Sequence, residues 1–330
     1  MTVQKEFEKT DVSAPTLCSQ PTLRRSDARV AAARQAEQRL FEHYDLVVEP
    51  HFVTLKSGRN VRVLESGHGA PLVLVPGGVG DGWIWAPLMA HLRDYRLLVV
   101  NRPGGGLSDG VDHTQVNMRQ LAVEVLTAVL DHFRLERAPI ICNSMGGLWS
   151  FWFALAQPQR VLALLQFGCP ALLLSTSAPF SMRLQSVPLL NRLLVKAMIP
   201  DSAEAARQLP GFLGHDERVG ANWPQPMADC GYRFPRLPTY KTAWLSLMES
   251  VLTLRGAAQR YALGADELRQ VQTPVLYTWG DNDPFGDLEA AYKAEKITPR
   301  AELTEWQGGH LPWWDDAAGC VDCMHDFLNE

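Results

Sequence analysis

The sequence predicts an α/β protein with a mostly parallel sheet, helices on both faces of the sheet and an inserted helical lid. Continuous apolar runs of strand length alternate with stretches of helical periodicity, which is typical of parallel strands joined by crossover helices. This alternation stops after residue 168, and residues 169–270 are rich in Leu, Pro, Arg and Trp before an apolar strand resumes. With 46% hydrophobic residues among 330, the chain has enough apolar mass for a full core.

The first elements precede the alternating part of the chain. Residues 1–25 are polar and mixed, which predicts a loose arm, whereas residues 26–44 place apolar side chains on one side of an amphipathic helix. We assign residues 1–45 to this arm and helix, which we expect to pack on the body or on the second subunit of a homodimer. Residues 51–67 alternate in polarity about the turn 57–60, which predicts a hairpin.

The remaining core divides into the two segments 46–168 and 271–330, and the helical lid occupies 169–270 between them. The expected strands of the core are 71–77, 95–103, 138–144, 161–168, 273–280 and 301–310. The expected helices between these strands are 83–92, 117–135 and 145–156. In the lid, an apolar roof is expected from Phe180, Met182, Leu189, Leu190, Met198, Trp223 and Trp244.

Composition and charge exclude several classes of protein. The chain has 31 basic and 36 acidic residues, a net charge of -5 and no long basic block, which excludes nucleic acid as a partner. The N-terminus carries acids and lysines where a secretory peptide needs about 7 to 15 apolar residues. No apolar stretch reaches the roughly 18 to 20 residues of a membrane-spanning helix. We therefore expect a cytoplasmic protein without a membrane span.

Six cysteines are ordinary usage for a chain of this length. Cys142 and Cys169 lie in apolar runs, as small core residues do. Cys320 and Cys323 have CxxC spacing with His325 nearby, but no second pair completes a metal site. We interpret them as two thiols on a helix and expect neither a metal nor a cofactor.

The run ICNSMGGL places Ser144 at the junction of an expected strand and an expected helix. This run is close to the nucleophile elbow G-x-S-x-G, in which small neighbours permit a strained turn that exposes the serine hydroxyl. Cys142 replaces the first glycine and is small enough to fit. A serine before two glycines also occurs in ordinary turns and helix caps, so the other members of the site decide the interpretation.

A serine nucleophile requires an imidazole base and an acid that fixes the imidazole tautomer, in the chain order Ser, acid, His for this type of elbow. Asp281 and Asp283 follow one expected strand, and His310 follows the last. We predict Asp283 as the acid and interpret Asp281 as a cap or turn residue. His132 and His325 lie in expected helices, where solvation or packing explains them.

Negative charge on a tetrahedral intermediate requires fixed hydrogen-bond donors. The run PGGVGDG after the first parallel strand offers the amides of Gly77, Gly78 and Val79, and the residue after the nucleophile offers the amide of Met145. We predict Gly78 and Met145 as the oxyanion hole. The glycine spacing does not match G-x-G-x-x-G, and the next strand ends at Asn101 rather than at an acid, which excludes a dinucleotide site.

These motifs resemble those of the α/β-hydrolase family over most of the chain. The resemblance rests on the elbow at Ser144, on Asp283 within WGDNDP, on His310 within GGHLPWW and on the loop RPGGGLSD at 102–109. Pro76 stands where many members have histidine. The family's halide and epoxide chemistry uses an aspartate nucleophile, so Ser144 argues against both.

The elbow form NSMGG and the glycine-rich oxyanion loop resemble carbon–carbon bond hydrolases of meta-cleavage products in particular. Those relatives carry tryptophan directly after the catalytic histidine and a lid arginine that binds a dienolate carboxylate. Here Leu311 occupies the first position, with Trp313 and Trp314 further on. Arg183 and Arg192 are both candidates for the lid arginine, and nothing in the sequence selects between them.

The resulting functional hypothesis is a serine hydrolase that cleaves a carboxylic ester or lactone with a hydrophobic acyl or aryl group. Its partner is a small hydrophobic substrate, expected to contact Gly77, Val79, Asn143 and Trp314. Hydrolysis of a carbon–carbon bond in a meta-cleavage-type diketone is the alternative reaction. From another class, a noncatalytic small-ligand binding protein remains open, because this fold also serves as a receptor.

Overall fold

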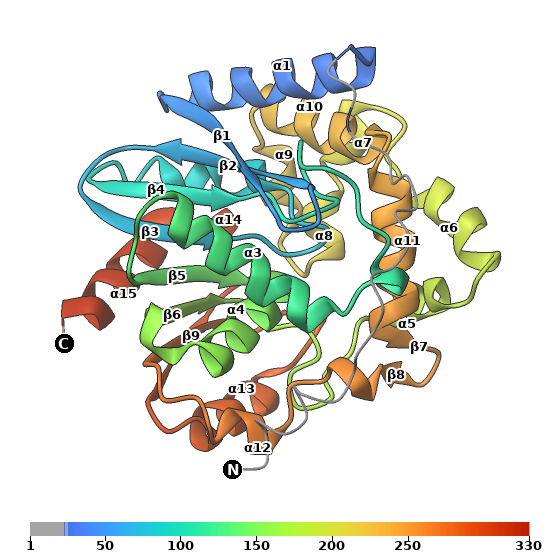
Figure 1. Cartoon of the computed structure of the whole chain (residues 1–330). Coiled ribbons are helices and arrows are strands. Elements are labelled where there is room, and N and C mark those ends of the chain that lie inside the picture. Colours follow the sequence, from blue (N-terminus) through green and yellow to red (C-terminus); the bar gives the residue numbers. More distant parts are fainter. Residues whose placement is uncertain (1–22, 24–25, 330) are drawn as a thin grey trace.

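The structure is a computed structural model that describes residues 23 and 26–329 (Figure 1). Its main feature is an eight-stranded sheet with the order β1-β2-β4-β3-β5-β6-β9-β10. The strands are β1 (Val48–Thr54), β2 (Asn60–Ser66), β3 (Ala70–Val75), β4 (Tyr95–Val100), β5 (Ala138–Asn143), β6 (Val161–Phe167), β9 (Val275–Gly280) and β10 (Ala301–Trp306). This is the expected α/β architecture.

Strand direction follows the sequence pattern. The alternating segments β1 and β2 form an antiparallel hairpin, and β2 pairs antiparallel with β4. From β4 to β10 all pairs are parallel. The strand order reverses at β3, which lies between β4 and β5. In open parallel sheets the crevice beyond the carboxyl ends at such a reversal is where ligands bind, and the candidate elbow directly follows β5.

Helices cover both faces of the sheet. Around the core they are α1 (Ala28–His43), η1 (Gly82–Trp85), α2 (Ala86–Met89), η2 (His113–Gln115), α3 (Met118–His132), α4 (Ser144–Ala156), η3 (Pro158–Arg160), α13 (Leu288–Ile297), α14 (Pro312–Asp315) and α15 (Ala317–Asn329). Val73 and Val75 pack on the face covered by α3 and α4, and Leu72 and Leu74 pack on the opposite face. Because side chains alternate along a strand, a strand that is apolar throughout contributes side chains to the hydrophobic core on both faces of the sheet.

The helix α1 packs on the body of this chain, which is one of the two positions that we expected from the sequence. Asp27 caps its N-terminus by accepting from the Arg29 amide at 2.8 Å. It packs against the lid helix α10 (Gln225–Arg233), as the upper part of Figure 1 shows, and its buried apolar residues belong to the same core cluster as those of α10. Glu37 of α1 forms a buried ion pair with Arg62 of β2 at 2.7 Å. The arm expected before α1 lies outside the described residues, apart from Leu23.

The segment between β6 and β9 holds the lid helices, most of which lie on the right in Figure 1, whereas the last of them packs beside α13 at the bottom. They are α5 (Phe180–Arg183), η4 (Leu184–Ser186), α6 (Leu190–Met198), α7 (Ala203–Ala206), α8 (Leu209–Phe212), α9 (Glu217–Ala221), α10, η5 (Phe234–Arg236), α11 (Tyr240–Val251), η6 (Gln259–Tyr261) and α12 (Ala265–Leu268). The segment also contains a small two-stranded sheet of β7 (Leu252–Thr253) and β8 (Gly256–Ala257), too short to produce an alternating pattern.

Three local expectations differ from the structure. The expected helix 83–92 is divided into η1 and α2. The last strand ends at Trp306 rather than at residue 310, because residues 307–309 form a glycine-containing bend. Some of the residues expected in the apolar roof of the lid are instead exposed, namely Phe180, Leu189, Leu190 and Met198.

Cys320 and Cys323 lie on α15 as free thiols, with Cys320 packed in the core. Within residues 26–329 no three His, Cys, Asp or Glu side chains are grouped as metal ligands. No helix in the described part of the chain is both long and apolar enough to cross a membrane.

Candidate active site

Ser144 lies at a sharp turn between β5 and α4. Its φ is +51°, in the left-handed region that non-glycine residues rarely occupy. The two glycines that follow allow α4 to approach the sheet closely. A Cβ on Gly146 would lie 2.1 Å from the Val75 carbonyl oxygen, and one on Gly147 would lie 2.0 Å from Gln166 Oε1. The sequence MGG therefore permits a strained elbow that leaves Ser144 only half-buried.

Asp283 and His310 form a buried pair beyond the ends of β9 and β10. His310 Nδ1 lies 2.7 Å from Asp283 Oδ2, which also accepts from the Cys169 amide at 2.7 Å. Asp283 Oδ1 accepts from the Phe285 amide at 2.9 Å. With its Nδ1 proton donated to a carboxylate, a neutral imidazole presents Nε2 as an acceptor. His310 Nε2 is buried and has no hydrogen-bond partner among the described residues.

Asp281 occupies a different environment from Asp283. Its Oδ1 accepts from the Gly308 amide at 2.9 Å and from Asn282 Nδ2 at 2.8 Å, and its residue is exposed. Asp281 thus fixes the turn after β10, whereas Asp283 contacts the imidazole.

Asn143 connects the elbow to the loop that carries His310. Its Nδ2 donates to the Phe167 carbonyl at 2.6 Å and to the His310 carbonyl at 3.0 Å. The residue is 2% exposed, so both amide hydrogens are used inside the protein. Asn143, which we predicted to contact substrate, thus uses its amide group to join the end of β6 to the His310 loop.

Gly78 lies in the loop after β3 with a φ of +53°, and a Cβ there would meet nothing within 4 Å. Arg102, which was not predicted from the sequence, binds the carbonyl groups of this loop. Its Nε donates to the Pro76 carbonyl at 3.1 Å, and its Nη2 donates to the carbonyls of Gly77, at 3.2 Å, and Gly78. The Gly77 carbonyl and the Gly78 amide belong to the same peptide group, and the C=O and N–H of a trans peptide point in opposite directions. Because the Gly77 carbonyl points toward Arg102, the Gly78 N–H points away from Arg102.

Arg102 is completely buried and lies over the Trp149 ring, 4.9 Å from the ring centroid. Burial lowers the pKa of its guanidinium to about 9, partly offset by the negative charge of Asp81. The group therefore remains a cation at neutral pH. Met145 supplies the other expected amide from the first turn of α4, where N–H groups have no acceptor within the helix.

The aromatic residues after His310 make their contacts with other parts of the chain. Trp313 stacks on Trp85, with ring centroids 4.0 Å apart, and its Nε1 donates to the Ile84 carbonyl at 2.9 Å. Trp314 lies against Trp223, with ring centroids 4.9 Å apart at an interplanar angle of 86°. Phe285, which was not anticipated, supplies the ring beside the imidazole, 4.3 Å from His310.

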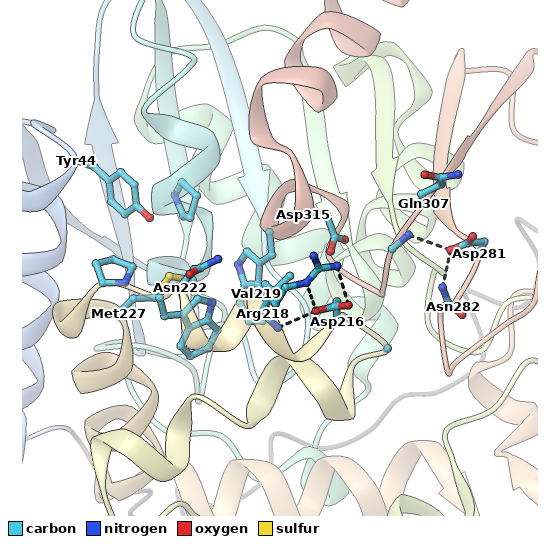
Figure 2. Close-up of a pocket in the computed structure, with 16 residues that line it drawn as sticks. Tyr44, Asp216, Arg218, Val219, Asn222, Met227, Asp281, Asn282, Gln307 and Asp315 are labelled. Carbon is cyan, nitrogen blue, oxygen red and sulfur yellow. Dashed lines mark hydrogen bonds and ion pairs between the residues drawn. The ribbon is translucent and has the colours of Figure 1, made fainter.

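Trp314 and Trp223 line a separate cavity of about 690 Å³ behind the His310 loop, and Ser144, Gly78 and His310 are not part of its lining. Figure 2 shows Tyr44 at one side of this cavity and Asp281 and Gln307 at the other. Trp314, which we predicted to contact substrate, is therefore part of this cavity wall in the structure.

A family model described as the alpha/beta hydrolase fold matches residues 70–317, which is most of the chain. This chain belongs to the α/β-hydrolase family. The chain is 29% identical over 289 residues to a 2-hydroxy-6-oxononadienedioate/2-hydroxy-6-oxononatrienedioate hydrolase of Cupriavidus pinatubonensis, covering 84% of this chain and 94% of that protein. It is 23% identical over 296 residues to a 2-hydroxy-6-oxo-6-phenylhexa-2,4-dienoate hydrolase of Burkholderia cepacia, covering 84% and 95%.

Solved structures of the family include similar folds with different chemistry. A carboxylesterase of Bacillus subtilis has a TM-score of 0.67 and 20% identity, covering 91% of this chain and 98% of that one. A meta-cleavage product hydrolase of Pseudomonas fluorescens has a TM-score of 0.65 and 19% identity, covering 84% and 97%. Since a carboxylesterase and a meta-cleavage product hydrolase share this fold, the fold alone does not select the bond that this α/β-hydrolase cleaves.

Proposed function

We propose that this α/β-hydrolase is a serine hydrolase that cleaves a carboxylic ester or lactone with a hydrophobic acyl or aryl group. The observation that carries the proposal is the buried Asp283–His310 pair, whose Nδ1–Oδ2 distance is 2.7 Å and whose Nε2 is left without a partner in the described structure. Asn143, the residue before Ser144, donates to the His310 carbonyl at 3.0 Å, which supports a site in which the elbow and this base act together.

In the first half of the reaction, Ser144 Oγ attacks the carbonyl carbon of the ester and His310 Nε2 takes the hydroxyl proton. Asp283 holds the imidazole in the required tautomer and stabilises the imidazolium. The amides of Gly78 and Met145 stabilise the oxyanion of the tetrahedral intermediate. Collapse of this intermediate breaks the ester bond, and His310 protonates the departing alcohol.

In the second half, His310 takes a proton from water as the water attacks the acyl-enzyme. The second tetrahedral intermediate is stabilised at the same two amides. Its collapse releases the carboxylic acid and returns the proton to Ser144 Oγ. No metal or cofactor enters these steps.

The environment of the candidate lid arginines supports an uncharged acyl group. The Arg183 guanidinium lies over the Phe180 ring, 5.3 Å from the centroid, and Arg192 is exposed on α6. Arg102 donates to loop carbonyls rather than toward the crevice. On this basis we expect none of these cations to hold a substrate carboxylate next to Ser144.

Carbon–carbon bond hydrolysis is the second candidate. It is favoured by the relatives of 29% and 23% identity, whose names describe hydrolases of oxo-dienoates. The same three side chains serve this reaction, which additionally requires protonation of the substrate at carbon.

A fluorophosphonate probe tests the nucleophile assignment. We expect the adduct on the peptide that contains Ser144, and we expect Ser144→Ala to abolish labelling and to lower kcat for an aryl ester by at least about 10³-fold. Ser57→Ala, at an exposed turn of the hairpin, is the matched control and should label normally. Labelling of another residue, or full activity of Ser144→Ala, contradicts the proposal.

A further inference from the structure

A second histidine–carboxylate pair lies behind the loop that carries His310. His215 of the lid places Nδ1 2.9 and 3.0 Å from the two carboxylate oxygens of Asp315, on α14. The His215 side chain is 0% exposed and that of Asp315 is 15% exposed. Because a carboxylate accepts at Nδ1, that nitrogen carries the proton and Nε2 is an acceptor.

The acceptor at His215 Nε2 receives the amide of Leu311, at 3.2 Å. On the other side of His310, the amide of Gly309 donates to Asp315 Oδ2, also at 3.2 Å. The two members of the pair therefore hold the two residues that flank the candidate base. His215 differs from His310 in this respect, since its Nε2 lone pair is used by a backbone amide and is not free to take a substrate proton.

The lid segment also contacts the intervening residue. The amide of His310 donates to the Leu213 carbonyl at 2.8 Å, so three consecutive amides of the loop donate to the lid or to Asp315. A Cβ on Gly309 would lie 2.5 Å from the Leu213 carbonyl oxygen and 2.7 Å from His215 Cδ2. Only glycine permits this close packing, which explains the residue before His310.

The carboxylate of this pair is partly exposed. Asp315 belongs to the wall of the cavity behind the loop, which it lines together with Asp216 (Figure 2), whereas the His215 side chain is fully buried. The His215–Asp315 pair thus connects the wall of a surface cavity, to which Asp315 belongs, with the His310 loop, whose Gly309 and Leu311 amides donate to the pair.

We propose that His215 is a positioning residue, which together with Asp315 attaches the lid to the His310 loop and sets the position of His310 Nε2 relative to Ser144. The proposal rests on the proposed hydrolase function. It assigns to the lid a part in holding the base, in addition to covering the crevice. Loss of the Leu311 contact releases one flank of His310 and lowers the fraction of molecules with reactive geometry.

Two amide variants separate this role from packing alone. In His215→Gln the side-chain amide reaches the place of Nε2, so its oxygen can accept from the Leu311 amide. In His215→Asn the side-chain amide lies near the place of Nδ1, so it keeps the donor to Asp315 but cannot accept from Leu311. Both replace the ring by a smaller polar group, and each is therefore the control for the other.

We expect kcat for an aryl ester to fall at least about tenfold in His215→Asn and less than about threefold in His215→Gln, with KM changed less than about twofold in both. Thermal unfolding of both variants gives the temperature at which each is folded for the assay. Equal kcat losses in the two variants, or an undiminished kcat in His215→Asn, would overturn the proposal.

The low-field imidazole proton resonances in the NMR spectrum give a readout that does not require turnover. The proton between His310 Nδ1 and Asp283 should keep its wild-type resonance in His215→Gln and should shift or broaden in His215→Asn. If the wild-type enzyme labels at no serine and hydrolyses no ester, the proposed function fails, and this comparison still decides whether His215 positions His310. An unchanged His310 resonance in both variants contradicts the positioning role.

Discussion

Asn143 Nδ2 donates to the carbonyl oxygen of His310 at 3.0 Å, which joins the residue before the elbow to the residue that presents the candidate base. The same nitrogen donates to the Phe167 carbonyl at 2.6 Å. Three segments of the chain therefore meet at one side-chain amide. The geometry of the crevice depends on this contact as well as on the residues that take part in the reaction.

The first prediction concerns this amide. Asn143→Asp places carboxylate oxygens against two carbonyl oxygens, and Asn143→Ala leaves both buried carbonyls without that donor. We expect each to lower the free energy of unfolding by about 1 to 3 kcal/mol, with the larger loss in Asn143→Asp. Urea unfolding at neutral pH measures the effect, and an Asp variant as stable as wild type would contradict it.

The second prediction separates the two aspartates after β9. Asp283→Asn should lower kcat by about 10³ to 10⁴-fold, because an amide in place of the carboxylate favours the wrong imidazole tautomer. Asp281→Asn is the matched control, since its side chain contacts the Gly308 amide rather than the imidazole, and it should cost less than about tenfold. Similar losses in two variants with the same circular dichroism would mean that the acid has been assigned wrongly.

How well the sequence predicts a feature of this structure depends on how far apart along the chain the contacting residues lie. The strands are predicted because Leu72 to Val75 and similar runs are apolar at every position, which requires burial on both faces. The strained turn at Ser144 is anticipated because small residues flank this serine at a strand-to-helix junction and because an acid and a histidine follow later strands in the order that the elbow requires. Asp283 and His310 are anticipated from their positions after successive parallel strands.

The missed residues share a different property. His215 contacts Asp315 across 100 residues of sequence, and it lies in an irregular lid segment without periodicity or motif. Arg102 donates to carbonyls that precede it by 24 to 26 residues, and its sequence signal is limited to an arginine at the end of a strand before a glycine-rich loop. Such hydrogen bonds depend on how loops pack after the strands have aligned, and no local pattern encodes them.

The third prediction is a pH dependence of stability. His113 is 1% exposed, and neither ring nitrogen has a hydrogen-bond partner within residues 26–329. Burial, together with the positive charges of Arg102 and Arg59, lowers its pKa to about 3. In the unfolded chain the pKa of histidine is about 6.5. The unfolded state therefore binds a proton that the folded state does not bind between pH 6.5 and 3.

Because its folded-state pKa is depressed, His113 contributes stability that is present above pH 6.5 and is lost as the pH falls toward 3. The loss amounts to about 2 kcal/mol at pH 5. We expect His113→Phe to show a correspondingly smaller decline in the free energy of unfolding between pH 7 and pH 5. His68→Phe, at an exposed position, is the control. An equal decline in His113→Phe and wild type would show that His113 titrates alike in both states.

The fourth prediction addresses the substrate class. Ester hydrolysis needs the nucleophile, the base and the oxyanion hole, whereas cleavage of a ring-fission dienone also needs protonation of the substrate at carbon and an anchor for its carboxylate. Leu311 is buried in the core, Trp313 stacks on Trp85, and the Arg183 guanidinium lies over Phe180. The aromatic ring beside His310 belongs to Phe285 instead, and neither Arg183 nor the residues after His310 is placed as a carboxylate anchor.

We therefore expect kcat/KM for medium-chain or aryl esters or for lactones to exceed that for a ring-fission dienone by at least about tenfold, which is roughly 1.4 kcal/mol in activation free energy. Steady-state kinetics on purified full-length chain measure the ratio. Arg183→Ala and Arg192→Ala should change ester hydrolysis less than about threefold. The opposite ranking of substrates, with a large loss in either arginine variant for the dienone alone, would assign the enzyme to carbon–carbon bond hydrolysis, because only that reaction uses a cation to hold the substrate carboxylate.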